Sequence, residues 1–278
     1  MSSPTMMQER IQNRHASPLH IPQRSVSPAL IATMDRSLPS LKARNVVIFD
    51  VETTGLLPKN NESIRPLQSV NLYDYPYITQ ISFIVYDSET KVIRTAYNAY
   101  IKIPQEVDIS ALITNLTGVT REICDQGVPI SEALLTFYNT YVCCDQIVAH
   151  NMEFDSTMIR VELERNYKEL LKRSPFIMGM RNFSNKLNPR MTCTMRHTID
   201  LCGLQRKSTR GLYKKFPKLE ELYLQLFCDN DENAANVPKN LHNSLMDTLV
   251  CLRCYLELTG QHMDQSVFDS YTRLLFGL

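Results

Sequence analysis

The stretch from residue 46 to residue 56 constrains the fold most, because an apolar run ends there in two closely spaced carboxylates. Val46 to Phe49 has the composition of a buried strand, and Asp50 and Glu52 follow it, ahead of a Thr-Thr-Gly turn. Side chains alternate between the faces of a strand, so both carboxylates point the same way. They repel each other unless a cation lies between them, and oxygen ligands suit Mg²⁺. For an isolated Asp-x-Glu pair, two solvated side chains beside a turn are the alternative.

The first 44 residues have the composition of a tail. They hold five of the fourteen prolines and six Lys/Arg against two Asp/Glu, in a chain whose net charge is +1. Such a segment buries too little apolar surface to offset the entropy lost on ordering. We therefore expect a basic, Ser- and Pro-containing disordered tail over residues 1–44 and one domain over 45–278. An arm that touches nucleic acid is the alternative for the tail, whereas the prolines argue against the amphipathic helix of a transit peptide.

The remainder alternates between strand and helix patterns, which predicts an α/β fold. Strands are expected at 46–51, 78–86, 92–103, 146–149 and 191–194. The second and third form a hairpin, so we expect a mixed sheet of about five strands, antiparallel in one part and parallel in another, flanked by α-helices.

Helix patterns cover most of what lies between and after these strands. Helices are expected at 109–115, 120–124, 131–141, 152–171, 216–227, 245–258 and 265–275. Asn151 is placed to cap the long helix, and Pro217 to lie in the first turn of another. The segments near 58–77 and 173–190 are expected to be inserted loops, and 201–215 to be basic and irregular.

The cysteine content and the hydropathy of the chain indicate the cellular compartment that we expect for the protein. Eight cysteines without a visible secretory signal indicate a reducing, intracellular setting, with cytoplasm and nucleus equally open. The chain has no apolar run of the roughly 18 residues that a membrane span needs. No membrane partner is expected.

Three further residues lie where we expect the chain to come back close to the end of the first strand. They are Asp155, His242 and Asp247. Asp155 begins the helix that follows strand 146–149, and helix starts of this kind lie over the carboxyl end of a strand. Asp247 lies on an apolar helix, five residues after His242. Residues five apart on a helix are separated by about 140° around its axis. We therefore expect His242 to precede the helix and to reach over a site that Asp247 helps to build.

These residues belong to three segments that together resemble a known family. Residues 49–56 (FDVETTGL), 148–155 (VAHNMEFD) and 242–247 (HNSLMD) resemble, in order and spacing, the three exonuclease motifs of the DEDDh, DnaQ-like family. The resemblance spans about residues 45–258. It implies a ribonuclease H-like fold and metal-dependent 3′→5′ hydrolysis of the terminal phosphodiester, which releases nucleoside monophosphates.

The resemblance also implies the catalytic roles. Asp50, Glu52, Asp155 and Asp247 would hold two Mg²⁺ or Mn²⁺ ions about 3.5–4 Å apart. His242 would act as the general base that takes a proton from the attacking water.

By the same resemblance, five further residues would contact the substrate. Thr53 and Thr54 would meet the terminal 3′-OH, Leu56 would pack on the last base, and His150 and Asn151 would line the site beside the scissile phosphate. Helix capping is the alternative for Asn151.

A basic run also lies within the stretch 201–215. Its members are Lys207, Arg210, Lys214 and Lys215, which would either meet phosphates or form a solvated loop.

The function expected first is a 3′→5′ exonuclease on single-stranded or frayed DNA, in replication proofreading or repair. An RNA 3′→5′ exonuclease is the alternative within the same class, because no residue settles whether a 2′-OH is accepted. A non-catalytic nucleic-acid-binding module on the same fold is the third hypothesis, and the five filled catalytic positions argue against it. Expected partners are DNA or RNA 3′ ends, with a DNA polymerase or another replication protein as a further candidate.

Overall fold

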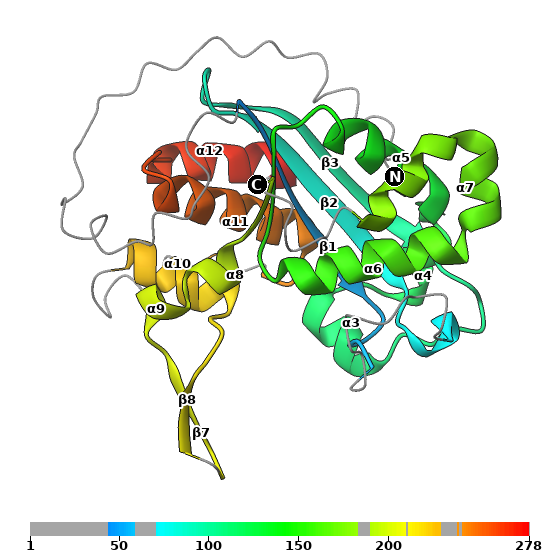
Figure 1. The fold of residues 1–278 in the computed structure, drawn as a ribbon, viewed down its shortest axis with the longest axis horizontal. Helices are drawn as coiled ribbons and strands as arrows, with labels where there is room; N and C mark the ends of the chain where they lie inside the picture. The colour runs from blue at the N-terminus through cyan, green and yellow to red at the C-terminus, as the bar shows by residue number, and fades with distance from the viewer. Residues whose placement is uncertain are drawn as a thin grey trace.

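The computed structural model describes residues 44–58, 71–182, 190–209, 211–228, 238 and 241–277. Nearly all of the predicted tail and most of the expected insertion near 58–77 lie outside these residues. The organising element is a six-stranded sheet in the order β4-β3-β2-β1-β5-β6, with β1 (Asn45–Thr53) in its interior (Figure 1).

The sheet is mixed, as the sequence predicts. Its other strands are β2 (Ile78–Asp87), β3 (Val92–Lys102), β4 (Val128–Pro129), β5 (Gln146–Ala149) and β6 (Met191–Cys193). Strands β1, β2 and β3 pair antiparallel, whereas β5 pairs parallel with both β1 and β6. The expectation of a mixed sheet of about five strands is confirmed, and the sheet has a sixth, very short strand. The strand β4 was missed because two residues are too short to show an alternating pattern.

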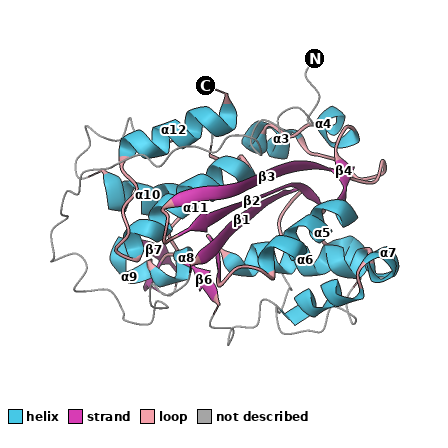
Figure 2. Cartoon of the chain, turned by 90° about the horizontal axis from the view of Figure 1, so that it is seen from above, coloured by secondary structure: helices cyan, strands magenta, loops and turns pink. Residues whose placement is uncertain are grey.

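Helices cover both faces of the sheet (Figure 2). One group comprises α5 (Ile130–Tyr141), α6 (Met152–Arg165), α7 (Tyr167–Arg173) and the 3₁₀ helix η3 (Pro175–Asn182). The other comprises α10 (Leu219–Phe227), α11 (Ser244–Leu258) and α12 (Gln265–Phe276). Shorter elements are η2 (Leu72–Asp74), α3 (Ala111–Thr117), α4 (Arg121–Asp125), α8 (Thr194–His197) and α9 (Ile199–Cys202).

The alternation of β1 assigns its side chains to two separate cores. Val47, Phe49 and Val51 pack in the core under α5 and α6, and Val46 and Ile48 pack in the core under α11. By this alternation Asp50 and Glu52 continue the row of Val46 and Ile48, on the face that α11 covers.

The stretch 201–215 differs most from expectation. Instead of being irregular, it forms an antiparallel hairpin of β7 (Gln205–Ser208) and β8 (Gly211–Lys214). Every described residue of both strands is exposed, so neither strand carries the apolar alternation by which half-buried strands are recognised.

Two helix predictions are also corrected. The helix expected over 152–171 breaks at Asn166 into α6 and α7. The helix expected from 216 begins at Leu219, with Lys218 as its N-cap residue, so Pro217 precedes it. Among the described residues, no helix is long and apolar enough to span a membrane.

Candidate active site

The carboxyl end of β1 supplies the first two acids. Asp50 and Glu52 are half-buried, and Ser244 at the start of α11 donates from its Oγ to the main-chain oxygen of Asp50 at 2.7 Å. The main-chain N–H of Ser244 donates to Gln80 Oε1 of β2 at 3.3 Å. These bonds fix the start of α11 against the strand that carries the acids.

His242 and Asp247 are brought together by the turn that precedes α11. Asn243 is the N-cap residue of the helix, and its side chain accepts from the N–H of Leu245 at 3.2 Å. His242 adopts a left-handed conformation with φ of 71°, and its N–H lies 3.2 Å from each carboxylate oxygen of Asp247. The prediction that His242 precedes the helix is confirmed, and its side chain is exposed.

Asp155 reaches the same strand end from the opposite helix layer. It lies in the first turn of α6, directly after β5, which runs parallel to β1. Its Oδ1 accepts from the N–H of Val51 at 3.3 Å, and the side chain is buried. Residues from both helix layers therefore meet at the carboxyl end of β1. The position of Asp155 agrees with the prediction that its helix begins over the carboxyl end of a strand.

Burial and mutual repulsion make this cluster costly to ionise. Burial raises the pKa of Asp50 to about 7, against a weaker opposing hydrogen bond from Ser244. Burial, followed by the charges of Asp50 and Asp247, raises the pKa of Glu52 to about 9. The pKa values of Asp155 and Asp247 are also raised well above the ordinary range, first by burial and then by the charge of Asp50.

The donor set fits a divalent cation. One ligand atom each from Glu52, His242 and Asp247 lies within 4.8 Å of the others. Asp50 Oδ2 is buried and has no hydrogen-bond partner among the described residues. A buried carboxylate oxygen without a donor is destabilising, and a hard cation would satisfy it.

The hydroxyl groups of Thr53 and Thr54, at and just after the end of β1, both make hydrogen bonds to main-chain groups of the protein. Thr53 is buried, and its Oγ1 donates to the main-chain oxygen of Gly55 at 2.6 Å. Thr54 Oγ1 accepts from the N–H of Tyr77 at 3.0 Å, and the Thr54 N–H donates to the Tyr77 oxygen at 2.9 Å. Leu56 is 85% exposed and lies four residues after Glu52 and six after Asp50 in the chain. Its expected contact with a terminal base remains a prediction.

The His150 side chain connects the end of β5 to two other segments of the chain through hydrogen bonds. Its Nδ1 lies 3.0 Å from Thr194 Oγ1, and its Nε2 lies 3.1 Å from the main-chain oxygen of Pro217. Since a carbonyl only accepts, Nε2 carries the proton, and Nδ1 accepts from the hydroxyl. Burial lowers the pKa of His150 to about 4, so the ring is neutral at pH 7. Both ring nitrogens are engaged, which leaves neither of them for a substrate phosphate in this arrangement.

Asn151 lies at the N-cap position of α6, where the sequence places it. It adopts a left-handed conformation with φ of 69°, and its side chain makes no capping hydrogen bond. The alternative that the Asn151 side chain caps α6 is therefore wrong. A capping side chain needs extended backbone at the N-cap residue to accept from the N–H groups of the first turn.

An ion pair that the sequence does not reveal supports the turn. Arg165 pairs with the buried Glu162 at 2.7 Å. The guanidinium also donates to the main-chain oxygens of Leu72, Tyr75 and Pro76 at 2.6–2.7 Å. It holds the segment that ends in Tyr77 and pairs with Thr54, so α6 carries Asp155 at one end and this support at the other. The only sign of this pair in the sequence is the three-residue spacing of Glu162 and Arg165, and oppositely charged residues at this spacing are common in helices.

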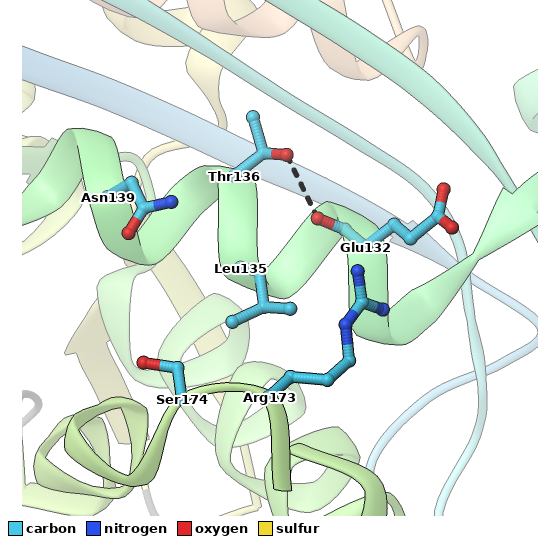
Figure 3. Close-up of a pocket in the computed structure, with 6 residues that line it drawn as sticks. All are labelled: Glu132, Leu135, Thr136, Asn139, Arg173 and Ser174. Carbon is cyan, nitrogen blue, oxygen red and sulfur yellow. Dashed lines mark hydrogen bonds between the residues drawn. The ribbon is translucent and has the colours of Figure 1, made fainter. Parts of the chain in front are cut away.

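A hollow elsewhere on the surface is separate from this site. It is lined by Glu132, Leu135, Thr136, Asn139, Arg173 and Ser174, from α5 and the end of α7 (Figure 3). None of the five predicted catalytic residues lines it, and its lining contains a single carboxylate. It offers no comparable metal site.

Comparison with known proteins agrees with the motif analysis. The family model described as exonuclease matches residues 47–255, three quarters of the chain. No curated protein matches the chain at a significant level.

Two solved structures of exonuclease I show a similar fold. The structure of Escherichia coli exonuclease I with a dT13 oligonucleotide has a TM-score of 0.51 and 16% identity, covering 84% of this chain and 46% of that one. Another exonuclease I structure has a TM-score of 0.53 and 16% identity, covering 83% and 44%. A 3′-exonuclease that recognises the histone mRNA stem-loop has a TM-score of 0.49 and 14% identity, covering 84% and 70%. The chain thus spans less than half the length of exonuclease I.

Proposed function

Because the chain belongs to the exonuclease family, with the five acidic and imidazole residues of its DEDDh, DnaQ-like branch, we propose that it is a 3′→5′ exonuclease on single-stranded or frayed DNA. The observation that carries this proposal is the gathering of Asp50, Glu52, Asp155 and Asp247 beside the exposed His242 at one strand end. Four acids with raised pKa values in one place cost stability, and binding of divalent cations is the chemistry that offsets this cost.

The four carboxylates are the groups that would hold two Mg²⁺ or Mn²⁺ ions. When bound, such ions lower the pKa of a coordinated water and balance the charge that develops on the phosphate. His242, exposed and anchored through its backbone to Asp247, would take the proton from the attacking water. Attack at phosphorus forms one P–O bond and breaks the bond to the 3′ oxygen, releasing a nucleoside 5′-monophosphate.

Single-stranded DNA is the first substrate to test. A protein of similar fold, exonuclease I, is known in complex with a dT13 oligonucleotide. A polymerase or another replication protein as partner, and a role in proofreading or repair, remain parts of the proposal that rest on the motif resemblance.

The test uses 5′-labelled single-stranded DNA, single-stranded RNA and a primer duplex with a mismatched 3′ end, each with Mg²⁺ or with EDTA. We expect EDTA-sensitive shortening from the 3′ end, fastest on single-stranded DNA. Faster shortening of RNA would reassign the substrate. Failure of all three to shorten would refute the exonuclease proposal.

Two variants separate the assigned roles. His242→Ala should slow cleavage by about 10²–10⁴-fold while Mn²⁺ binding persists, because it removes the base but none of the carboxylates. Asp155→Ala should lose both cleavage and Mn²⁺ binding. Unchanged single-turnover cleavage by His242→Ala would show that the base is misassigned.

A further inference from the structure

The hairpin of β7 and β8 is separated from the main sheet and extends away from the body of the molecule below α8 and α9 (Figure 1). An isolated two-stranded hairpin is marginal in water, and this one exposes Leu212 by 70% and Tyr213 by 48%.

Charge is the first feature. Residues 203–219 contain six Lys/Arg and no Asp or Glu. Lys214 pairs with Asp200, and Lys215 pairs with Glu221. Arg206 and Lys207 have no acidic partner within the described part of the chain, so both are available to an anionic partner.

The register of the hairpin sorts these side chains by face. Arg206 lies opposite Tyr213, and Lys207 lies opposite Leu212. Paired residues in an antiparallel ladder share a face, so one face presents a guanidinium beside an aromatic ring, and the other presents an ammonium beside an aliphatic side chain. A cation beside a ring is the combination that binds phosphates and stacks unpaired bases.

The base of the hairpin is tied to the candidate active site by two routes. Pro217, three residues after β8, accepts from His150, which directly follows β5. Arg196 pairs with Glu153, two residues before Asp155, and its guanidinium lies 5.7 Å from the centre of the Phe216 ring. Phe216 is 48% exposed. An exposed ring and a cation therefore link the first turn of α6 to the segment that follows the hairpin.

We propose that the β7–β8 hairpin binds the single-stranded part of the substrate that lies upstream of its 3′-terminal nucleotide. This proposal rests on the proposed function, because it places the terminal nucleotide at the acids. Arg206 and Lys207 contact phosphates, and Tyr213 stacks on a base. An acidic protein surface would suit the charges but gives no role to the ring beside Arg206.

The test measures the affinity of full-length protein for 20-nucleotide oligothymidylate and oligouridylate in EDTA. The double variant Arg206→Ala/Lys207→Ala is compared with Lys168→Ala/Lys172→Ala, which removes two exposed cations from α7. Each contact to a phosphate of single-stranded nucleic acid adds about 0.7 to the steepness with which the logarithm of the binding constant falls with the logarithm of salt concentration. At 0.1 M salt this corresponds to about fivefold in affinity. We expect the hairpin variant to bind about 10- to 25-fold more weakly, with a slope smaller by about 1.4, and the control to be unchanged.

Tyr213→Ala should weaken binding by about fivefold or more, and Tyr213→Phe should retain it, since stacking needs the ring and not the hydroxyl. Equal affinities of the hairpin variant and the α7 control for both oligonucleotides would overturn the proposal.

The p-nitrophenyl ester of thymidine 5′-monophosphate tests the active site separately, because it carries a single nucleotide and cannot reach the hairpin. We expect wild type and hairpin variant to hydrolyse it at equal rates. Slower hydrolysis by the variant would show that the hairpin acts on the site itself and would also overturn the proposal. No EDTA-sensitive hydrolysis by wild type, combined with normal oligonucleotide binding, would count against the proposed function and leave the hairpin as a binding arm.

Discussion

Removing one carboxylate from the cluster of four acids at the end of β1 should stabilise the metal-free protein at alkaline pH. Burial and the charges of Asp50 and Asp247 raise the pKa of Glu52 to about 9, whereas an unfolded chain ionises this group near its ordinary value of 4.5. Between these values the folded protein holds a proton that the unfolded chain has released. Stability therefore falls as the pH rises, by about 1.4 kcal/mol per pH unit for each proton retained.

The interval from about pH 7 to 8.5 lies between the folded pKa of Glu52, about 9, and its ordinary value of 4.5. One retained proton costs about 2 kcal/mol over this interval, which lowers the melting temperature of a chain of this size by about 4–8 °C. His150 contributes little here, because its pKa of about 4 and its ordinary value of 6.5 both lie below the interval. Asp50, with a pKa of about 7, adds a smaller decrease of the same sign.

The assay is thermal unfolding in EDTA and in Mg²⁺ across this interval, for wild type, Glu52→Gln and the control Glu132→Gln, an exposed carboxylate on α5. Wild type should lose stability with pH in EDTA. Glu52→Gln should lose less and should unfold at a higher temperature than wild type at pH 8.5. Mg²⁺ should raise the melting temperature of wild type more at pH 8.5 than at pH 7, because the cation binds the ionised carboxylates. It should have little effect on Glu52→Gln.

Two results would refute this reasoning. If the melting temperature of wild type in EDTA were constant or increased from pH 7 to 8.5, the carboxylates would not retain protons in the fold. If Glu52→Gln and Glu132→Gln behaved alike, the effect would not arise in the cluster.

Two further predictions concern the support of the fold. Arg165→Met should lower the free energy of unfolding by about 3–5 kcal/mol in urea titrations, because it leaves the buried Glu162 charge unpaired. Adding Glu162→Gln should recover part of the loss, and a double variant no more stable than the single one would contradict this account. Gly127→Ala should cost about 1–3 kcal/mol by the same measurement, because a Cβ there would lie 2.7 Å from main-chain atoms of Tyr100 and Ile101 in β3. Gly179→Ala, where nothing lies within 4 Å of the added Cβ, is the control and should be close to neutral.

The strands of the main sheet show what local patterning can predict. The apolar runs of β1, β2 and β5 are long or buried enough to give a clear signal, and their bounds agree with expectation to within a few residues. The hairpin β7–β8 gave no such signal, because all of its described residues are exposed. Its pairing is set by the register between two polar segments, which periodicity does not report.

The features of the candidate site also divide into those that local spacing predicts and those that depend on tertiary contacts. The i, i+2 spacing on a strand is sufficient to place Asp50 and Glu52 on one face, and helix geometry is sufficient to place His242 ahead of α11. The raised pKa values depend instead on burial beneath α6 and α11 and on the distances between the acids. Likewise, the neutral His150 depends on Thr194 and Pro217, which lie 44 and 67 residues away in the chain.

The sequence alone therefore predicted the long strands and helices, the family and five candidate catalytic residues, because each rests on spacing within a short segment. The tertiary structure decided which oxygens are left without donors and which threonine hydroxyls are already engaged. It also decided that the basic stretch after α9 forms a hairpin tied to the active-site edge. The physical reason is that desolvation, hydrogen-bond satisfaction and charge repulsion depend on distances in space between residues that are far apart in sequence.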